Sequence, residues 1–344
     1  MNIDDDFSGL LKRLVEGRSL SAETSLRAFA AIMAGEVSET RMSSFLTALA
    51  LREPTIDEIA GAARAMRAAM RTIAAPPNAI DLCGTGGDGH GTLNISTAAA
   101  FVVAACGVPV AKHGNRNMSS KSGAADVLEA LGVRIDLSPQ QASACLQKTG
   151  LCFLFAPSYH PAMKHVAPVR KELGFRTVFN LLGPLSNPGG VRRQLLGVFA
   201  ERWAEPLAGV LLELGSERAW VVHGRDGMDE LTITGPSLVI AIEDGTTRRF
   251  ELEPESLGLK RAPLDSVKGG DAAYNARELE LLLEGHGNQA YGDIVILNSA
   301  AALSISGIVP GMEEGVGLAK EALVAGRARA KLEQLRATTL GPAA

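Results

Sequence analysis

Two runs of residues have the types and spacing needed to hold a phosphorylated ligand. The first, residues 81–97, reads Asp-Leu-Cys-Gly-Thr-Gly-Gly-Asp-Gly-His-Gly-Thr-Leu-Asn-Ile-Ser-Thr. Its glycines let the backbone approach an anion closely, and the alanine-rich segment that follows predicts a helix whose first N–H groups point at that anion. The second, residues 112–120, reads Lys-His-Gly-Asn-Arg-Asn-Met-Ser-Ser and supplies further donors. Together they favour a phosphate site over a flexible surface turn.

The first run also fits the spacing of a dinucleotide-binding loop, through Gly84, Gly86 and Gly89. Such a site begins its helix at the loop and places an acidic residue about 20 positions further on. Here the helix is expected to begin near Asn94, and the next predicted strand ends in the basic Lys112. Both features disfavour a dinucleotide site. A Walker-type loop is excluded because no Gly-Lys-Ser/Thr ends the run.

A pair of carboxylates, Asp229 and Glu230, follows the strand-like run at residues 218–223. Carboxylate oxygens are the ligands that Mg²⁺ prefers, and the ion usually keeps waters and binds phosphates as well. If this strand and the two before the glycine-rich and basic runs are neighbours in a parallel sheet, all three loops open on one sheet edge. Taken singly, Lys112 fits a surface charge and the acidic pair fits a solvated turn, so their co-occurrence carries the hypothesis.

The elements that must position these residues change character at Ile80. Residues 7–70 show apolar side chains at helical spacing and capping signals at 21–24 and 55–58, which predicts about four helices with a scaffold or oligomer role. From Ile80 onward, strand-like and helix-like segments alternate, with a hairpin expected around Asp244-Gly245. Residues 293–303 are expected to run from a strand into a helix. The pattern predicts an α/β fold with a small helical N-terminal unit.

Composition excludes some classes of protein. The 344 residues are 46% hydrophobic, enough for a sizeable core, and the formal net charge of −4 gives no basic excess for nucleic-acid binding. No uncharged apolar run is long enough to span a bilayer, and the acidic N-terminus does not resemble a signal peptide. The four cysteines form no close metal-type pair, so a reducing cytoplasm is expected.

In combination, the motifs closely resemble the anthranilate phosphoribosyltransferase family of tryptophan biosynthesis, from the helical N-terminus to beyond residue 310. The resemblance rests on Asp-x-x-Gly-Thr-Gly-Gly-Asp at 81–88, Asn-Ile-Ser-Thr at 94–97, Lys-His-Gly-Asn-Arg at 112–116, Ser-Ser-Lys-Ser-Gly at 119–123, Arg170, Gly-Pro-Leu-Ser-Asn-Pro at 183–188 and Asp229-Glu230. It implies a helical domain at residues 1–76, against which helices from about 160–188 pack. It also implies an α/β domain at residues 77–344, with a central mostly parallel sheet flanked by helices, as in the pyrimidine nucleoside phosphorylases.

The resemblance also implies ligands and site residues. It implies phosphoribosyl pyrophosphate (PRPP) as donor substrate, held by Gly84, Thr85, Gly86, Gly87, Asp88, Thr92, Asn94, Ser96, Thr97, Lys112, Ser119 and Ser120. It implies anthranilate as acceptor, held by Gly84, His113, Asn115, Met163, Arg170 and Pro184. It implies Lys112, His113 and Arg170 as catalytic residues, and two Mg²⁺ ions, one delivered with PRPP, with protein ligands Ser96, Asp229 and Glu230. A homodimer through the helical domain is implied as well.

The chemistry asked of these residues is consistent with the resemblance. The acceptor is an aromatic amine with a free lone pair, which needs positioning more than a strong base. Arg170 suits its ortho carboxylate because a guanidinium binds a carboxylate with two parallel hydrogen bonds. His113 either stacks on the ring or accepts a proton.

Two alternatives remain at this point. A pyrimidine nucleoside phosphorylase of related fold would use orthophosphate and need no acidic metal pair. A non-catalytic relative that binds nucleic acid would show a basic face and degraded site motifs. The intact Asp229-Glu230 pair and the negative net charge favour the transferase.

Overall fold

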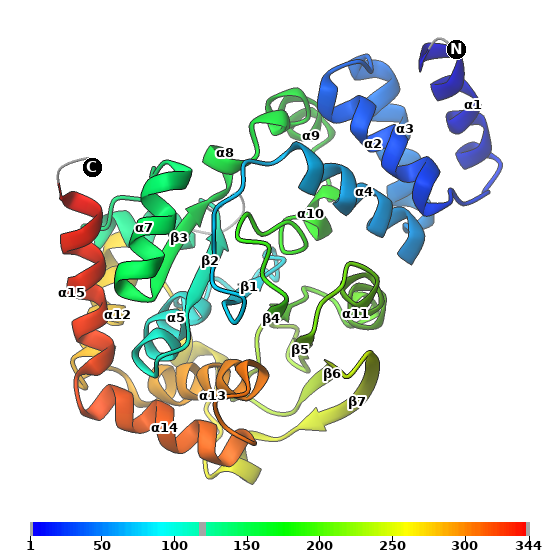
Figure 1. Ribbon diagram of the computed structural model, residues 1–344. Coiled ribbons are helices and arrows are strands. Elements are labelled where there is room, and N and C mark those ends of the chain that lie inside the picture. The colour runs from blue at the N-terminus through cyan, green and yellow to red at the C-terminus, as the bar shows by residue number, and fades with distance from the viewer. Residues whose placement is uncertain (1–2, 117–121, 342–344) are drawn as a thin grey trace.

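The computed structural model describes residues 3–116 and 122–341, and its N-terminal helices lie together at one end of the molecule (Figure 1). These helices are α1 Ile3–Val15, α2 Ala22–Ala34, α3 Glu39–Arg52 and α4 Ile56–Ala69. Over the described residues no strand precedes Ile80, so the prediction of about four helices before the first strand is confirmed.

Helix α4 begins and packs as its sequence predicts. Thr55 accepts the backbone N–H of Glu58 at 3.3 Å, and the Glu58 carboxylate accepts the N–H of Thr55 at 2.8 Å, which is a reciprocal capping box. Gly61 lets α4 cross α2 closely, because a Cβ atom there would lie 2.2 Å from the carbonyl oxygen of Ala22. The two helices therefore form one rigid pair.

A single sheet of seven strands forms the centre of the remaining chain, in the order β3-β2-β1-β4-β5-β6-β7. The strands are β1 Ile80–Gly84, β2 Val110–Gly114, β3 Leu151–Phe155, β4 Arg193–Gly197, β5 Arg218–Gly224, β6 Ser237–Glu243 and β7 Thr246–Leu252. Strands β1 to β5 are mutually parallel, β6 pairs antiparallel with β5, and β7 pairs antiparallel with β6. The predicted mostly parallel sheet flanked by helices is confirmed.

Helices cover both faces of the sheet (Figure 1). They are α5 Ile95–Ala105, α6 Ala124–Ala130, α7 Pro139–Thr149, α8 Ala156–Tyr159, α9 Ala167–Leu173, α10 Phe179–Leu182, α11 Ala204–Glu213, α12 Ala272–Leu283, α13 Gln289–Ser306, α14 Met312–Val324 and α15 Arg327–Leu340. Short 3₁₀ helices occur at η1 Pro161–His165, η2 Glu201–Trp203, η3 Pro254–Leu257 and η4 Leu264–Val267. None of the described helices is both long and apolar enough to cross a membrane.

Two hydrophobic cores lie on the two faces of the sheet. Because side chains alternate along a strand, Leu82 of β1 enters the core under α5 and α13, whereas Cys83 enters the core on the other face. This second core continues into the N-terminal helices, where the Phe29 ring meets the Phe179 ring at 5.7 Å between centroids. The helical unit is thus attached to one face of the sheet through apolar packing. The domain boundary at residues 76/77 stays a prediction.

The expected strand at the start of residues 293–303 is wrong, because the whole segment lies within α13. All α13 residues from Ala290 to Ile305 are buried. A helix buried on every side loses the polar stripe that marks an amphipathic helix, so its apolar run reads like a buried strand.

The expected hairpin is confirmed between β6 and β7, which pair antiparallel. Its two turn residues have positive φ, 50° at Asp244 and 72° at Gly245. Aspartate and glycine are the residue types that tolerate this conformation in a two-residue turn.

Candidate active site

The site lies at the carboxyl ends of β1, β2 and β5. Strand β1 stands between β2 and β4, so the chain changes its direction of progress across the sheet at β1. In parallel α/β sheets the crevice at such a switch point is where ligands bind. The glycine loop after β1, the described part of the basic run at the end of β2 and the acidic pair after β5 all lie at this edge, as expected from the sequence.

The glycine loop is built around the carboxylate of Asp229. Oδ2 of Asp229 accepts the backbone N–H of Gly86 at 2.7 Å. A Cβ atom at Gly84 would lie 2.2 Å from the same oxygen, so a side chain there would displace the carboxylate. Gly86 and Gly87 have φ of 69° and 79°, a left-handed conformation that favours glycine. The loop and the acidic pair are therefore one structural unit.

Two further contacts hold the glycine loop from outside. The Thr85 hydroxyl accepts the N–H of Phe199 at 3.0 Å. The guanidinium of Arg176 lies over the Phe199 ring, 4.1 Å from its centroid, and donates to the carbonyl oxygen of Gly87. Arg176 is exposed, so an arginine from the segment between α9 and α10 places its positive charge beside the glycine loop.

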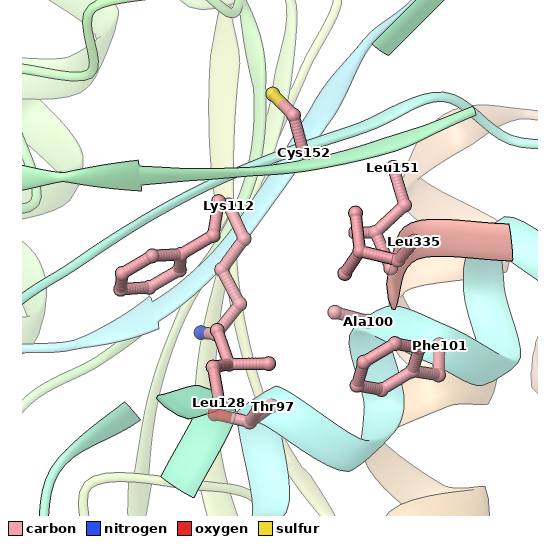
Figure 2. A pocket seen from close by; sticks show the side chains of 9 residues that line it. Thr97, Ala100, Phe101, Lys112, Leu128, Leu151, Cys152 and Leu335 are labelled. Atoms are coloured by element: carbon pink, nitrogen blue, oxygen red, sulfur yellow. The ribbon is translucent and has the colours of Figure 1, made fainter. Parts of the chain in front are cut away.

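Lys112 is buried at the end of β2, with 4% of its surface exposed. Its Nζ donates to the carbonyl oxygen of Leu82 at 2.6 Å and to the Ser96 hydroxyl at 3.1 Å. An ammonium group carries three donors, so one remains for a ligand. Figure 2 shows the lysine stem beside the side chains of a small, largely apolar cavity, to which Thr97 contributes. Thr97 is itself only 1% exposed.

Three carboxylates gather beside the glycine loop. Burial and the neighbouring Asp88 carboxylate raise the pKa of Asp229 above its usual range. Burial and the neighbouring Asp229 raise the pKa of Glu230 to about 8, against the opposing effect of Lys112. Proximity of like charges and loss of water both disfavour the ionised forms. A divalent cation would relieve this repulsion, so the residues present fit Mg²⁺.

On the acceptor side, the His113 and His160 rings meet with their Nε2 atoms 3.2 Å apart. They are 5% and 4% exposed. Burial and the His160 ring lower the pKa of His113 to about 3, and burial lowers the pKa of His160 to about 4. Both rings are therefore uncharged at neutral pH, and the pair as a whole carries no charge.

The backbone at His113 is held by a buried carboxylate. Oδ1 of Asp81 accepts the N–H of His113 at 3.1 Å, and its Oδ2 accepts Nδ2 of Asn187 at 2.7 Å. The same Asn187 nitrogen donates to the carbonyl oxygen of Ala111 at 2.8 Å. Burial raises the pKa of Asp81. This network ties β1 and β2 to the end of the segment between β3 and β4, residues 156–192, which we call the connector.

Arg170 lies on α9, and its guanidinium makes no ion pair with any described residue. It donates to Oδ1 of Asn180 at 3.5 Å and lies 5.7 Å from the Phe179 ring centroid. Burial lowers the pKa of the guanidinium, which nonetheless stays charged at neutral pH. Because no described carboxylate pairs with it, this half-buried arginine can bind an acidic ligand.

The other predicted acceptor residues differ in burial. Met163 is half-buried on η1, and Pro184 is buried, with its carbonyl oxygen accepting Nε2 of Gln194 at 2.7 Å. Asn115 is exposed after β2. The predicted phosphate contacts Ser119 and Ser120 lie outside the described residues.

Comparison with known proteins shows the family. The helical bundle domain of the glycosyl transferase family matches residues 8–70, and its a/b domain matches residues 76–329. The anthranilate phosphoribosyltransferase of Azorhizobium caulinodans is 54% identical over 97% of this chain and 96% of its own length. That of Rhodopseudomonas palustris is 52% identical over 97% of this chain and 98% of its own. The chain belongs to the anthranilate phosphoribosyltransferase family.

Solved structures of the family agree with this fold. The crystal structure of the Thermus thermophilus member has a TM-score of 0.91 and 46% identity, over 96% of this chain and 99% of that one. The Saccharomyces cerevisiae member, solved in complex with PRPP and Mg, has a TM-score of 0.90 and 30% identity, over 97% and 98% of the two chains.

Three residues that contact the predicted site residues were missed from the sequence. His160 stands 47 positions from the histidine it contacts, and Arg176 stands 89 positions from Gly87. Asn275 stands 181 positions from Asn94. Their local sequence carries no chemical signature, and only the fold brings each to its partner.

Proposed function

We propose that this chain transfers the phosphoribosyl group of PRPP to the amine of anthranilate, giving N-(5-phosphoribosyl)anthranilate and pyrophosphate, the second step from chorismate to tryptophan. One observation carries the proposal: a glycine loop, a buried lysine and an acidic pair meet at one sheet edge. Membership of the anthranilate phosphoribosyltransferase family supports the same reaction.

On the donor side, residues 84–88 surround the diphosphate and ribose of PRPP. Asn94 and Ser96 at the start of α5 donate to its phosphates, together with Thr92, Thr97, Ser119 and Ser120. Lys112 offers its remaining N–H to the diphosphate. Support comes from the buried Lys112 ammonium and from the N–H groups that a helix start leaves free.

Asp229, Glu230 and Ser96 are the proposed protein ligands of Mg²⁺, with two ions in each active site. When bound, Mg²⁺ neutralises charge on the diphosphate as it leaves. Support comes from the raised pKa values of the two carboxylates and from the Mg bound with PRPP in the yeast relative.

The transfer makes a bond between the anthranilate nitrogen and ribose C1 and breaks the bond from C1 to the diphosphate oxygen. Negative charge develops on the leaving diphosphate, where the ammonium of Lys112 stabilises it. The amine loses a proton in the same step, and the departing diphosphate or solvent takes it up. Because the amine of anthranilate is uncharged and has a free lone pair near neutral pH, the main task of the protein is to orient that lone pair toward C1.

The acceptor side orients anthranilate through one charge and several uncharged surfaces. Arg170 binds the carboxylate, and the neutral His113–His160 pair lies against the ring, with Asn115, Met163, Pro184 and the backbone of Gly84 nearby. Support comes from the absence of an ion pair to Arg170 among the described residues and from the low pKa values of the two histidines. A yeast relative has been solved in complex with 4-fluoroanthranilate.

The proposed assembly is a cytoplasmic homodimer that forms through a helical domain at residues 1–76. Two exposed apolar side chains on these helices, Val15 at 80% and Leu51 at 84%, would be covered by such contact. Light scattering of the full chain tests the dimer, and Leu51→Glu should then shift it toward monomer.

The reaction is tested with purified chain, PRPP, anthranilate and MgCl₂, by following the loss of anthranilate fluorescence and identifying the product by mass. Activity should vanish when EDTA removes Mg²⁺ and return when Mg²⁺ is restored. PRPP with Mg²⁺ should also raise the melting temperature, since a ligand that binds only the folded state stabilises it. No phosphoribosylanthranilate at high enzyme concentration would overturn the proposal.

A further inference from the structure

A buried amide from α12 contacts Asn94, which the proposed function places among the PRPP phosphate donors. Asn275 lies in the first turn of α12 and is 1% exposed. Its Nδ2 donates to Oδ1 of Asn94 at 2.8 Å. Asn94 stands at the N-cap position of α5, yet its side chain accepts no N–H of that helix. The contact with Asn275 therefore sets the orientation of the Asn94 amide.

The hydrogen bonds of Asn275 fix which end of its amide faces Asn94. The backbone N–H of Gly270 can only donate, and it donates to Oδ1 of Asn275 at 2.7 Å. The NH₂ end of Asn275 must then face Asn94 and find an acceptor there, which is Oδ1 of Asn94. The NH₂ group of Asn94 is left on the other side.

This polarity suits a phosphate ligand. The oxygens of an ionised phosphate accept hydrogen bonds and do not donate them, so a protein amide must present its NH₂ end to them. With its oxygen engaged by Asn275, Asn94 has only that end to offer at the start of α5. An amide turned the other way would place a carbonyl oxygen against the phosphate.

The segment that carries Asn275 is itself held against the glycine-rich run. The N–H of Gly269 donates to the carbonyl oxygen of Gly91 at 2.9 Å, and Thr92 and Lys268 form an isolated antiparallel bridge. A Cβ atom at Gly269 would lie 2.6 Å from the Thr92 carbonyl oxygen and 2.9 Å from Oδ1 of Asn275. Residues 267–275 thus form a second support that meets the phosphate-facing run in a fixed register.

We propose that Asn275 is a positioning residue that holds the Asn94 amide with its NH₂ group toward the phosphates of PRPP. The proposal rests on the proposed function, because it assigns Asn94 a phosphate ligand. It adds that the donor polarity of Asn94 is imposed by a residue that does not itself touch the substrate.

The Asn275→Asp variant tests the polarity directly. Aspartate keeps the shape and still accepts the Gly270 N–H, but its second oxygen now attracts the NH₂ end of Asn94. The Asn94 amide should turn and present its oxygen to the phosphate. We expect the KM for PRPP to rise about 10- to 100-fold, as for a lost hydrogen bond to a charged group, and the KM for anthranilate to change less than about twofold.

A cycle with Asn94→Ala separates positioning from the effect of the added charge. Asn94→Ala alone should raise the KM for PRPP, and in that background Asn275→Asp should add less than about twofold. An equal rise from Asn275→Asp in both backgrounds overturns the proposal. Asn78→Asp, which adds the same charge at an exposed turn before β1, should leave the KM for PRPP within about twofold and serves as the matched control.

Folding and the proposed function are checked separately. Melting temperatures with and without PRPP and Mg²⁺ identify a variant that fails to fold, in which case Asn275→Ala replaces Asn275→Asp. That variant frees the Asn94 amide to rotate, so it should raise the KM for PRPP about 3- to 10-fold and only while Asn94 is present. A normal KM for PRPP in Asn94→Ala would instead refute the phosphate role of Asn94, and inactive wild-type protein would refute the transferase itself.

Discussion

The donor and acceptor sides of the crevice are built in different ways. The donor side takes its groups from the ends of parallel strands and the start of α5, and it is strongly charged, with Lys112, Asp229 and Glu230 in close proximity. The acceptor side takes His160 and Arg170 from the connector and His113 from β2, so it contains an uncharged histidine pair and one cation. The difference matches the proposed ligands, a metal-bound polyphosphate and an aromatic ring with one carboxylate.

One residue crosses this division. Arg176 belongs by sequence to the connector that carries the acceptor side, yet it contacts Gly87 and Phe199 on the donor side. The connector therefore positions groups on both sides of the crevice. Four measurements test whether the two sides behave as separate units.

The largest effect on activity is expected from a substitution in the acidic pair. Asp229→Asn removes a charge that the proposed Mg²⁺ requires, although the amide oxygen can still accept the Gly86 N–H. We expect kcat/KM to fall about 10²- to 10³-fold, as for the loss of a group that stabilises developing charge. Steady-state kinetics across a Mg²⁺ titration measure this. Asp265→Asn, on the exposed η4, is the matched control, and wild-type kinetics in Asp229→Asn would refute the charge-based donor side.

Arg170→Ala should act on the other substrate. Removing a charge-assisted hydrogen bond to the carboxylate should raise the KM for anthranilate about 10- to 100-fold and leave the KM for PRPP nearly unchanged. Lys171→Ala, the exposed neighbour on α9, should have no such effect. A selective rise in the KM for PRPP would place Arg170 on the donor side.

Arg176→Ala should give a smaller effect on PRPP. The variant loses a cation beside the glycine loop and its contact with the Phe199 ring, so the KM for PRPP should rise about 3- to 10-fold. Arg202→Ala provides the comparison, because Arg202 lies 5.8 Å from the Trp203 ring centroid and pairs with Glu53. If the KM for anthranilate rises instead, Arg176 acts on the acceptor side, like the residues next to it in the sequence.

We expect the smallest effect on activity from the histidine pair. Its main effect is to make the free energy of unfolding depend on pH. In the unfolded chain a histidine has a pKa near 6.5, whereas the folded values are about 3 for His113 and about 4 for His160. Below about pH 6.5 the unfolded state therefore binds more protons, and stability falls by up to about 1.4 kcal/mol per pH unit for each histidine.

Urea unfolding at pH 7 and pH 5 measures this loss. His160→Gln should reduce the loss between the two pH values, and His286→Gln, at an exposed position, should leave it unchanged. A pKa near 6.5 in the pH profile of kcat/KM that disappears in His160→Gln would contradict the conclusion that the histidine pair stays uncharged.

The sequence predicted which loops meet at the sheet edge because the residues of each loop are contiguous in the chain. Glycines that need positive φ, a helix start and an acidic pair are each recognisable from neighbouring residue types, and parallel strands then bring them to one edge. It failed at α13, because complete burial removes the periodicity by which a helix is recognised. It also missed His160, whose chemistry depends on a ring far away in the sequence.

By itself, the sequence determined the α/β class, the helical N-terminal unit and the family of this protein, because these depend on periodicity and on contiguous motifs. Only the tertiary structure decided the ionisation and orientation of the site groups. Burial against distant partners makes the histidines neutral, raises the pKa of the acidic pair and sets the polarity of the Asn94 amide. Those properties arise from desolvation and hydrogen-bond geometry, which a linear order of residues does not contain.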